Sequence, residues 1–311
     1  MRSPKTVLEN LQRHSLDKSY KYERLYRNLY NHDFYLLAYQ NVYANKGAMT
    51  PGIDGLTLDG YGNERINNLI DTLKNRSYQP TPARRRYIPK KNGKMRPLGI
   101  PSANDKLVQE VVRMMLESIY EPSFSKYSHG FRPQRSCHTA LLQIQHNFTG
   151  VKWFVEGDIK AYFDTIDHHV LISILRRRIA DESFIDLIWK FLRAGYLENW
   201  QYNATFSGTP QGSGISPILA NIYLNELDSY MEEYKVEFDR GDARRSNNEY
   251  TMRQSRYKRY VDKCKNNWTT MNEEEKANAL TEQKRLRKEY QQFPAHAPQD
   301  ELSLIHISEP T

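Results

Sequence analysis

One short apolar segment constrains this chain more than any other feature. Residues 153–155 are Trp-Phe-Val, Asp158 follows them closely, and Phe163 lies five residues further on. Bulky apolar residues bounded by polar ones favour a short buried β-strand. The strand would deliver the Asp158 carboxylate at or near its end, with the Ile159 backbone carbonyl beside it. A carboxylate in that position either binds a metal ion or caps a turn.

Charge and tyrosine content favour a nucleic-acid partner. The 311 residues suffice for one large domain or two smaller ones, and 45 Lys and Arg against 37 Asp and Glu give a net charge of +8. Many of the 22 tyrosines lie beside a basic residue. Cations attract phosphate backbones, and aromatic rings stack on the bases of single strands. The alternative is a basic soluble protein whose tyrosines are buried in its core.

Cysteine usage indicates a reducing compartment, and hydropathy indicates neither a membrane span nor a signal region. Cys137 and Cys264 lie too far apart for a metal-binding pair and make no disulfide framework. No apolar run approaches the roughly 20 residues of a membrane span, and no apolar signal region follows the N-terminus. We therefore expect a cytoplasmic protein that makes no membrane contact.

A basic β-hairpin is the clearest local element. Residues 84–101 contain Asn92-Gly93, the favoured two-residue turn, between strands rich in Lys and Arg. Residues 196–206 are expected to form a further strand or hairpin. Apolar residues at helical spacing and capping residues predict the helices. The expected helices are residues 6–45, 59–74, 105–120 capped by Asn104 or Asp105, 136–148, 170–178 capped by Asp167, 184–193 and 218–236.

Composition changes after Glu237. Residues 240–290 are polar, basic and poor in large aliphatic side chains, and within them 252–265 and 273–290 predict two exposed helices, arranged as a helical hairpin. Such a charge run is typical of a solvated surface, with RNA contact as the alternative. Residues 303–311 share no pattern with the preceding chain and are expected to be a non-native tail.

The carboxylates after residue 155 suggest metal-assisted chemistry on a polynucleotide. Two-metal nucleotidyl transfer needs carboxylates on neighbouring strands that hold two divalent ions roughly 3.5–4 Å apart, and Asp158 fits the first of them. An unrelated metal nuclease could instead use Asp158, Asp164 and Asp167. That spacing ties all three to one strand-to-helix turn, however, and Asp167 is better explained as a helix cap.

Other residues fit a nucleotide substrate. Lys90, Lys91 and Arg96 of the hairpin could close over a triphosphate. Gln211, in a glycine-rich turn ahead of a helix, could approach the nucleotide, and Phe163 could wall off the 2′ side of its sugar. Taken one at a time, an exposed charged hairpin, a turn and a core aromatic explain them equally well. Their order along the chain is the specific signal.

Five blocks of this sequence resemble the reverse transcriptases encoded by bacterial group II introns, the intron maturases. The blocks are Gly52-Ile-Asp-Gly, Ile88-Pro-Lys-Lys-Asn-Gly-Lys-Met-Arg-Pro-Leu-Gly-Ile-Pro, His129-Gly-Phe-Arg-Pro, Asp158-Ile-Lys-Ala-Tyr-Phe-Asp-Thr-Ile-Asp-His and Gly208-Thr-Pro-Gln-Gly-Ser-Gly-Ile-Ser-Pro-Ile-Leu-Ala-Asn-Ile-Tyr-Leu. They cover about residues 20–235. Five blocks in one order argue strongly against a chance match.

The resemblance implies an α+β fold, namely the fingers and incomplete palm of a right-hand polymerase with a polar helical insertion. It makes Asp158 the catalytic aspartate and, with Ile159, a ligand of the two Mg²⁺ ions of the intact enzyme. The implied partners are intron RNA, an RNA template with its DNA primer, and deoxynucleoside triphosphates. The nucleotide-binding residues would be Lys90, Arg96, Phe163 and Gln211. The RNA-binding residues are expected to be Arg84, Arg85, Arg86, Lys91 and Arg132.

The sequence departs from that family at the second metal-binding motif. The family carries a Tyr-x-Asp-Asp turn between two strands, whereas the similar string here is Tyr260-Val-Asp-Lys263, in which a lysine replaces the second carboxylate. It lies in the polar insertion without flanking apolar alternation, so we interpret it as unrelated. The expected organisation is an N-terminal helical extension (1–45), fingers and partial palm (46–235), a basic helical insertion (236–302) and the tail.

Two functions follow from this organisation. The first is an RNA-directed DNA polymerase of a group II intron, truncated before its second aspartate motif and inactive by itself because one aspartate cannot hold two metal ions. The second is a non-catalytic module that binds intron RNA. An unfinished palm would leave a strand edge and apolar helix faces uncovered, which predicts self-association.

Overall fold

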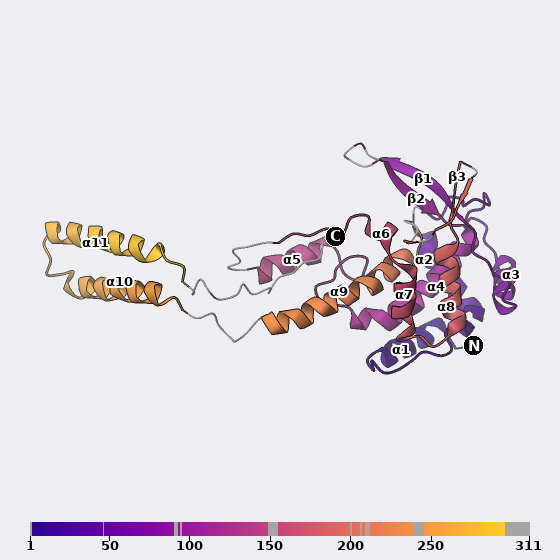
Figure 1. Cartoon of the computed structure of the whole chain (residues 1–311), viewed down its shortest axis with the longest axis horizontal. Helices are drawn as coiled ribbons and strands as arrows, with labels where there is room; N and C mark the ends of the chain where they lie inside the picture. Colours follow the sequence, from indigo (N-terminus) through magenta and orange to yellow (C-terminus); the bar gives the residue numbers. More distant parts are fainter. Residues whose placement is uncertain are drawn as a thin grey trace. The chain divides into compact units, whose positions relative to one another are not determined.

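The structure, a computed structural model, describes residues 2–45, 47–89, 93, 95–148, 155–199, 201–205, 207–208, 212–238 and 246–295. The chain divides into two compact units, one covering Met1–Tyr230 and the other beginning at Met231 (Figure 1). The first combines helices with a mixed sheet, so the predicted α+β class is confirmed. Among the described residues, no helix is long and apolar enough to cross a membrane.

Helix α4 (Ala103–Tyr120) lies at the centre of the first unit and packs against α1 (Pro4–Ser15) and α2 (His32–Tyr43). Its predicted apolar stripe is confirmed by burial. The fully buried residues are Leu107, Val108, Val111, Val112, Met115, Leu116 and Ile119.

The cap predicted for α4 was wrong. Ser102, rather than Asn104 or Asp105, caps the helix, because its hydroxyl accepts the hydrogen bond of the Asp105 amide. The Asp105 carboxylate is buried and accepts hydrogen bonds from the hydroxyls of Tyr78 and Thr81. Burial raises the pKa of Asp105, although these hydrogen bonds oppose the rise.

The helix predicted over residues 6–45 is divided into separate elements. Residues 16–25 interrupt it between α1 and the 3-10 helix η1 (Tyr26–Tyr30), which precedes α2. In this interruption Tyr22 makes a parallel bridge with Ile179, and its hydroxyl donates to the Leu11 carbonyl at 2.8 Å. A long-range backbone pairing therefore replaces the helix here. The next helix, α3 (Asn63–Lys74), begins four residues later than predicted and buries its expected apolar face.

The basic hairpin belongs to a sheet that, among the described residues, has the strand order β2-β1-β3-β4. Strands β1 (Ala83–Pro89) and β2 (Met95–Ile100) are antiparallel. Strand β3 (Tyr196–Glu198) pairs in parallel with β1 and turns back into β4 (Gln201–Asn203), which confirms the second predicted hairpin.

The hairpin register differs from the one that a two-residue turn requires. Such a turn at Asn92-Gly93 places Pro89 opposite Arg96, whereas Pro89 lies opposite Met95. Gly93 has a φ of +78°, the left-handed conformation that closes longer hairpin loops. Side chains alternate between the two faces of a strand. A one-residue shift of β2 against β1 therefore changes which basic residues of the two strands lie on the same face of the sheet.

The remaining helices of the first unit lie close to their predicted positions. They are α5 (Cys137–Asn147), α7 (His168–Arg176), α8 (Glu182–Arg193) and α9 (Ser216–Phe238), within which the unit boundary falls. Asp167 caps α7 as predicted, since its carboxylate accepts hydrogen bonds from the amides of His169 and Val170. A short helix, α6 (Tyr162–Thr165), was not predicted.

The strand predicted before Asp158 was wrong over the part of it that the structure describes. Residues 155–159 have no regular secondary structure, and the Val155 side chain is 90% exposed. Residues 153 and 154 lie outside the described residues. A strand needs a hydrogen-bonded neighbour, and none of β1 to β4 pairs with this segment. An apolar sequence without a partner strand therefore leaves Asp158 on an irregular, exposed stretch.

The second unit contains the predicted helical hairpin. Helices α10 (Asn248–Asn267) and α11 (Glu273–Gln291) pack together, and Arg253 pairs with Glu289 across them at 2.6 Å. The Tyr260-Val-Asp-Lys string lies in the interior of α10. A helical segment cannot be a turn between two strands, so the interpretation of this string as unrelated is confirmed. Residues 303–311 lie outside the described residues.

Candidate nucleotide and nucleic-acid site

The loop that precedes α9 is fixed at its first end to the turn after Asp158. The Gly208 amide donates to the Ile166 carbonyl at 2.8 Å, and the Gly208 carbonyl accepts from His168 Nε2 at 2.6 Å. Gly208 has a φ of +81°, and a Cβ built on it would lie 2.6 Å from the Phe163 carbonyl oxygen. Only glycine allows this approach. The loop therefore holds the backbone of Phe163 in place.

The other end of the loop lies on the basic hairpin. Gly212 has a φ of +106°, and a Cβ there would meet the Gly99 carbonyl oxygen at 2.5 Å and the Leu98 side chain at 2.8 Å. Ser213 Oγ and the Gly214 amide both donate to Gln109 Oε1 of α4, each at 3.0 Å. The same loop thus contacts strand β2 and the Phe163 turn, which are far apart in sequence. Gln211, directly before Gly212, lies outside the described residues.

The register sorts the basic residues of the hairpin onto two faces. Arg84, Arg86 and Arg96 share one face with Leu98, against which Gly212 lies. Arg85 is on the opposite face, with its guanidinium carbon 4.0 Å from the centre of the Tyr196 ring. Arg84 Nε is buried and has no hydrogen-bond partner among the described residues. Lys90 and Lys91 lie outside them.

Asp158 and Ile159 are both exposed on the segment before α6. Among the described residues, no group of three or more His, Cys, Asp or Glu side chains could hold a metal ion. Asp158 and Ile159 therefore stay predictions as metal ligands. One carboxylate and one backbone carbonyl fit a share of a metal site, and a two-ion site needs further ligands.

Phe131, which was not predicted to be a site residue, lies beside Phe163. The two rings meet edge to face with their centres 6.2 Å apart. Phe131 is 72% exposed and has a φ of +53°, an unfavourable conformation for a bulky residue. The side-chain Nδ2 of Asn221 donates to the carbonyl of Gly130, the residue before Phe131, at 2.9 Å and ties this turn to α9. The signal in the sequence was a large aromatic inside an otherwise polar turn.

Arg132, predicted to bind RNA, is buried and paired inside the protein. Its guanidinium pairs with Glu121 at 2.8 Å and donates to the carbonyls of Ser125 and Ser128 at 2.6 and 2.8 Å. The side chain is only 5% exposed. A cation held by these acceptors inside the protein serves the fold, and a role of Arg132 in RNA binding stays a prediction.

The nuclease alternative is also contradicted. The Asp167 carboxylate is committed to the first turn of α7, and the hydrogen bond from the Val170 amide, with that of His169, lowers the pKa of Asp167. Within the described residues Asp158, Asp164 and Asp167 do not form a metal-binding group.

The amino-acid sequence of this chain matches a known protein family and several known proteins. Residues 88–287 match the family described as "Reverse transcriptase (RNA-dependent DNA polymerase)". The "Group II intron-encoded protein LtrA" of Lactococcus lactis subsp. cremoris is 50% identical over 94% of this chain and 49% of its own length. An "Uncharacterized 91 kDa protein in cob intron" of Schizosaccharomyces pombe is 50% identical over 75% of this chain and 29% of its own length.

A third relative also matches more than two thirds of this chain. "Protein YkfC" of Escherichia coli is 42% identical over 70% of this chain and 59% of its own length. The chain spans about half the length of LtrA, at 49%.

Proposed function

The chain belongs to the reverse transcriptase family, within it to the group II intron-encoded proteins, and we propose that it forms the part of such an enzyme that binds the incoming nucleotide and its RNA template. In this proposal Arg84, Arg86 and Arg96 hold phosphates, and Phe163 lies against the nucleotide sugar. Gln211 and Lys90 complete the nucleotide site, and the whole enzyme copies RNA into DNA and takes part in intron splicing and mobility.

The observation that supports this proposal most is the loop before α9. Gly208 of this loop contacts the Phe163 turn, and Gly212 contacts β2. The loop therefore joins the Phe163 turn and the basic hairpin, neither of which predicts a nucleotide site by itself. The buried, unpartnered Arg84 Nε on the loop's face of the hairpin offers a donor to an anionic ligand. A triphosphate and an RNA phosphate are such ligands.

Mg²⁺ enters the proposal through Asp158 and the Ile159 carbonyl. When bound, paired divalent ions activate the attacking hydroxyl and stabilise the leaving phosphate. The residues of this chain position the nucleotide, and Phe163 blocks a larger substituent on the 2′ side of its sugar. The sequence contains no Tyr-x-Asp-Asp string, so in this proposal Asp158 supplies one share of the metal site.

Primer extension by the 311 residues alone tests whether Asp158 suffices for the metal site. We expect the chain to bind an RNA template annealed to a DNA primer without extending it, because a single carboxylate does not hold the paired ions. Extension is measured on a gel with Mg²⁺ and all four deoxynucleotides, beside Asp158→Ala as the matched control. Product from the unaltered chain that disappears in Asp158→Ala contradicts the prediction of inactivity.

The alternative function is a module that binds intron RNA without polymerisation. The basic face of the hairpin favours it equally, since phosphate contacts need no catalysis. The two functions differ in their response to a nucleotide. A polymerase site binds its template and primer more tightly when the complementary deoxynucleotide is present, whereas a module that only binds RNA does not respond to it.

Self-association is a further proposal, carried by exposed apolar residues on α5. Leu141 is 63% and Leu142 is 52% exposed, and none of the residues of α5 is buried. We expect light scattering to give an average mass above 36.7 kDa at high protein concentration. The double variant Leu141→Gln and Leu142→Gln is expected to shift the mass toward the monomer. A monodisperse monomer from the unaltered chain contradicts the proposal.

A further inference from the structure

Phe131 combines two features that are each unfavourable for an aromatic residue. Its side chain is 72% exposed, although burial of a phenyl ring stabilises a fold. Its φ of +53° is left-handed, a conformation that glycine and asparagine adopt far more readily than a bulky residue does. No other aromatic residue in the described ranges has a positive φ. Strained backbone of this kind persists where surrounding contacts enforce it, and it is found most often at functional sites.

The contacts on either side of Phe131 enforce this conformation. On one side the buried Arg132 guanidinium donates to two backbone carbonyls, at 2.6 and 2.8 Å. On the other side the Nδ2 of Asn221, from α9, donates to the Gly130 carbonyl at 2.9 Å. The turn is therefore anchored at residues 130 and 132, and the aromatic ring between these anchors is the group that it presents.

The ring of Phe131 contacts that of Phe163. The two ring centres are 6.2 Å apart and the ring planes are 88° apart, the edge-to-face arrangement that aromatic pairs favour. Phe163 is half-buried, and its backbone lies against Gly208. The other described ring beside it is that of Tyr162, its neighbour in α6. Phe131 thus comes from a separate segment and restricts the side-chain torsions of Phe163.

We propose that Phe131 is a positioning residue, which holds the Phe163 ring in the orientation that excludes a 2′-hydroxyl group. The pair of rings, and not Phe163 alone, then sets the discrimination against ribonucleotides. This inference rests on the proposed function of Phe163 at the nucleotide sugar. A phenyl ring that moves between staggered rotamers leaves room for the hydroxyl group part of the time. Loss of the Phe131 ring therefore weakens discrimination and leaves nucleotide binding in place.

Dissociation of an RNA template with a DNA primer from the full chain, in Mg²⁺ with either the complementary deoxynucleotide or the complementary ribonucleotide, tests this inference. Phe131→Asn removes the ring, and asparagine tolerates the left-handed backbone. In this variant we expect the ribonucleotide, which has no effect on the unaltered chain, to slow dissociation about threefold, the order of magnitude that one aromatic pair contributes. The deoxynucleotide is expected to keep its effect.

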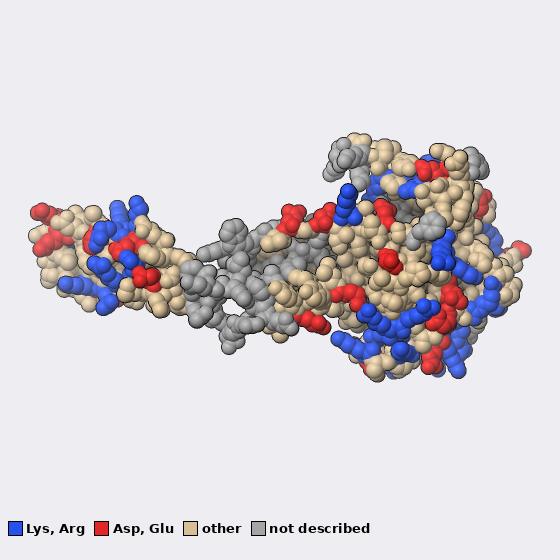
Figure 2. Space-filling view, viewed as in Figure 1, with Lys and Arg blue, Asp and Glu red and all other residues tan. Residues whose placement is uncertain are grey.

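Phe131→Tyr retains the ring, so we expect it to keep the discrimination of the unaltered chain. Neither variant changes a charged residue. The Lys and Arg side chains that Figure 2 shows over the first unit therefore keep their attraction for the RNA in both variants. A change in nucleotide response is then separate from a general loss of RNA binding.

A double variant shows whether Phe131 acts through Phe163. Phe163→Val is predicted to admit the ribonucleotide fully, so the addition of Phe131→Asn is expected to change nothing further. A purely structural role of Phe131 predicts instead that Phe131→Asn has the same effect in both backgrounds. Urea denaturation of each variant, followed by circular dichroism, measures the structural contribution separately.

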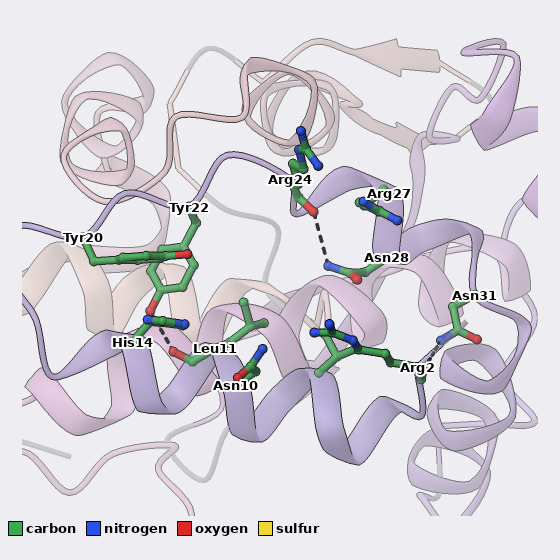
Figure 3. Close-up of a pocket in the computed structure, with 11 residues that line it drawn as sticks. Arg2, Asn10, Leu11, His14, Tyr20, Tyr22, Arg24, Arg27, Asn28 and Asn31 are labelled. Carbon is green, nitrogen blue, oxygen red and sulfur yellow. Dashed lines mark hydrogen bonds between the residues drawn. The ribbon is translucent and has the colours of Figure 1, made fainter.

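The matched control is Tyr20→Asn, which also removes an exposed and paired aromatic ring. Tyr20 is 37% exposed and stacks on His14 of α1, with the ring centres 4.3 Å apart (Figure 3). We expect this control to keep the difference between the two nucleotides. The inference is overturned if the ribonucleotide still has no effect in Phe131→Asn, if the deoxynucleotide loses its effect there, or if the control gains an equal response to the ribonucleotide. An unaltered chain that does not respond to the complementary deoxynucleotide overturns the proposed function, and this inference with it.

Discussion

A chain with Arg84→Gln, Arg86→Gln and Arg96→Gln together is expected to bind single-stranded RNA on the order of a hundredfold more weakly at 50 mM salt. These three residues share the hairpin face on which the loop before α9 rests. Each phosphate contact contributes about 0.7 to the salt slope for a single strand, so the slope is expected to become shallower by about 2. Filter binding at a series of salt concentrations measures both quantities.

The control for this variant carries the same change in charge. Lys5→Gln, Lys74→Gln and Arg176→Gln also remove three positive charges, and each of those residues already pairs with an acidic neighbour. We expect the control to keep most of its RNA affinity. Equal losses in both triple variants show that RNA responds to net charge alone, which contradicts a defined hairpin surface.

Arg132→Ala is expected to lower the free energy of unfolding by about 3 kcal/mol, because it leaves the partly buried Glu121 carboxylate without its cation. The same change removes the guanidinium hydrogen bonds to the carbonyls of Ser125 and Ser128. Together these groups fix the turn that presents Phe131. Urea denaturation followed by circular dichroism measures the loss.

Glu121→Gln serves as the comparison for Arg132. The amide oxygen still accepts from the guanidinium, and the two carbonyl contacts persist, so we expect a smaller loss than for Arg132→Ala. Unchanged stability with weakened RNA binding in Arg132→Ala would contradict this structural role and support the predicted role of Arg132 in RNA binding.

Helical periodicity and motif order predicted much of the fold, and tertiary pairing decided the rest. The α4 stripe was predictable because seven apolar residues recur at helical spacing, and all are buried. The division of residues 6–45 was not, since it depends on the pairing of Tyr22 with the distant Ile179. The irregular stretch at 155–159 was missed for a related reason: an apolar run favours a strand only where a neighbouring strand is present.

The candidate site was predictable in its members and not in its assembly. The basic hairpin and Phe163 could be named from motifs, but the close contacts of Gly208 and Gly212 that join them depend on three-dimensional proximity. Arg132 and Arg84 are both arginines in predicted RNA-binding motifs. Arg132 pairs with Glu121, whereas the buried Nε of Arg84 has no hydrogen-bond partner among the described residues. Gln109, which accepts the hydrogen bonds of the loop, is a polar residue between the apolar residues of α4, and nothing in the sequence indicated its contact.

Dissociation of an RNA template with a DNA primer from the 311-residue chain, in Mg²⁺ with single nucleotides, tests the proposed nucleotide site most directly. We predict that the complementary deoxynucleotide slows dissociation about tenfold, or about 1.4 kcal/mol, and that mismatched deoxynucleotides and the complementary ribonucleotide do not. Phe163→Val is predicted to let the ribonucleotide act as well as the deoxynucleotide. Dissociation that is equally fast with complementary and mismatched nucleotides would contradict a polymerase nucleotide site in this chain.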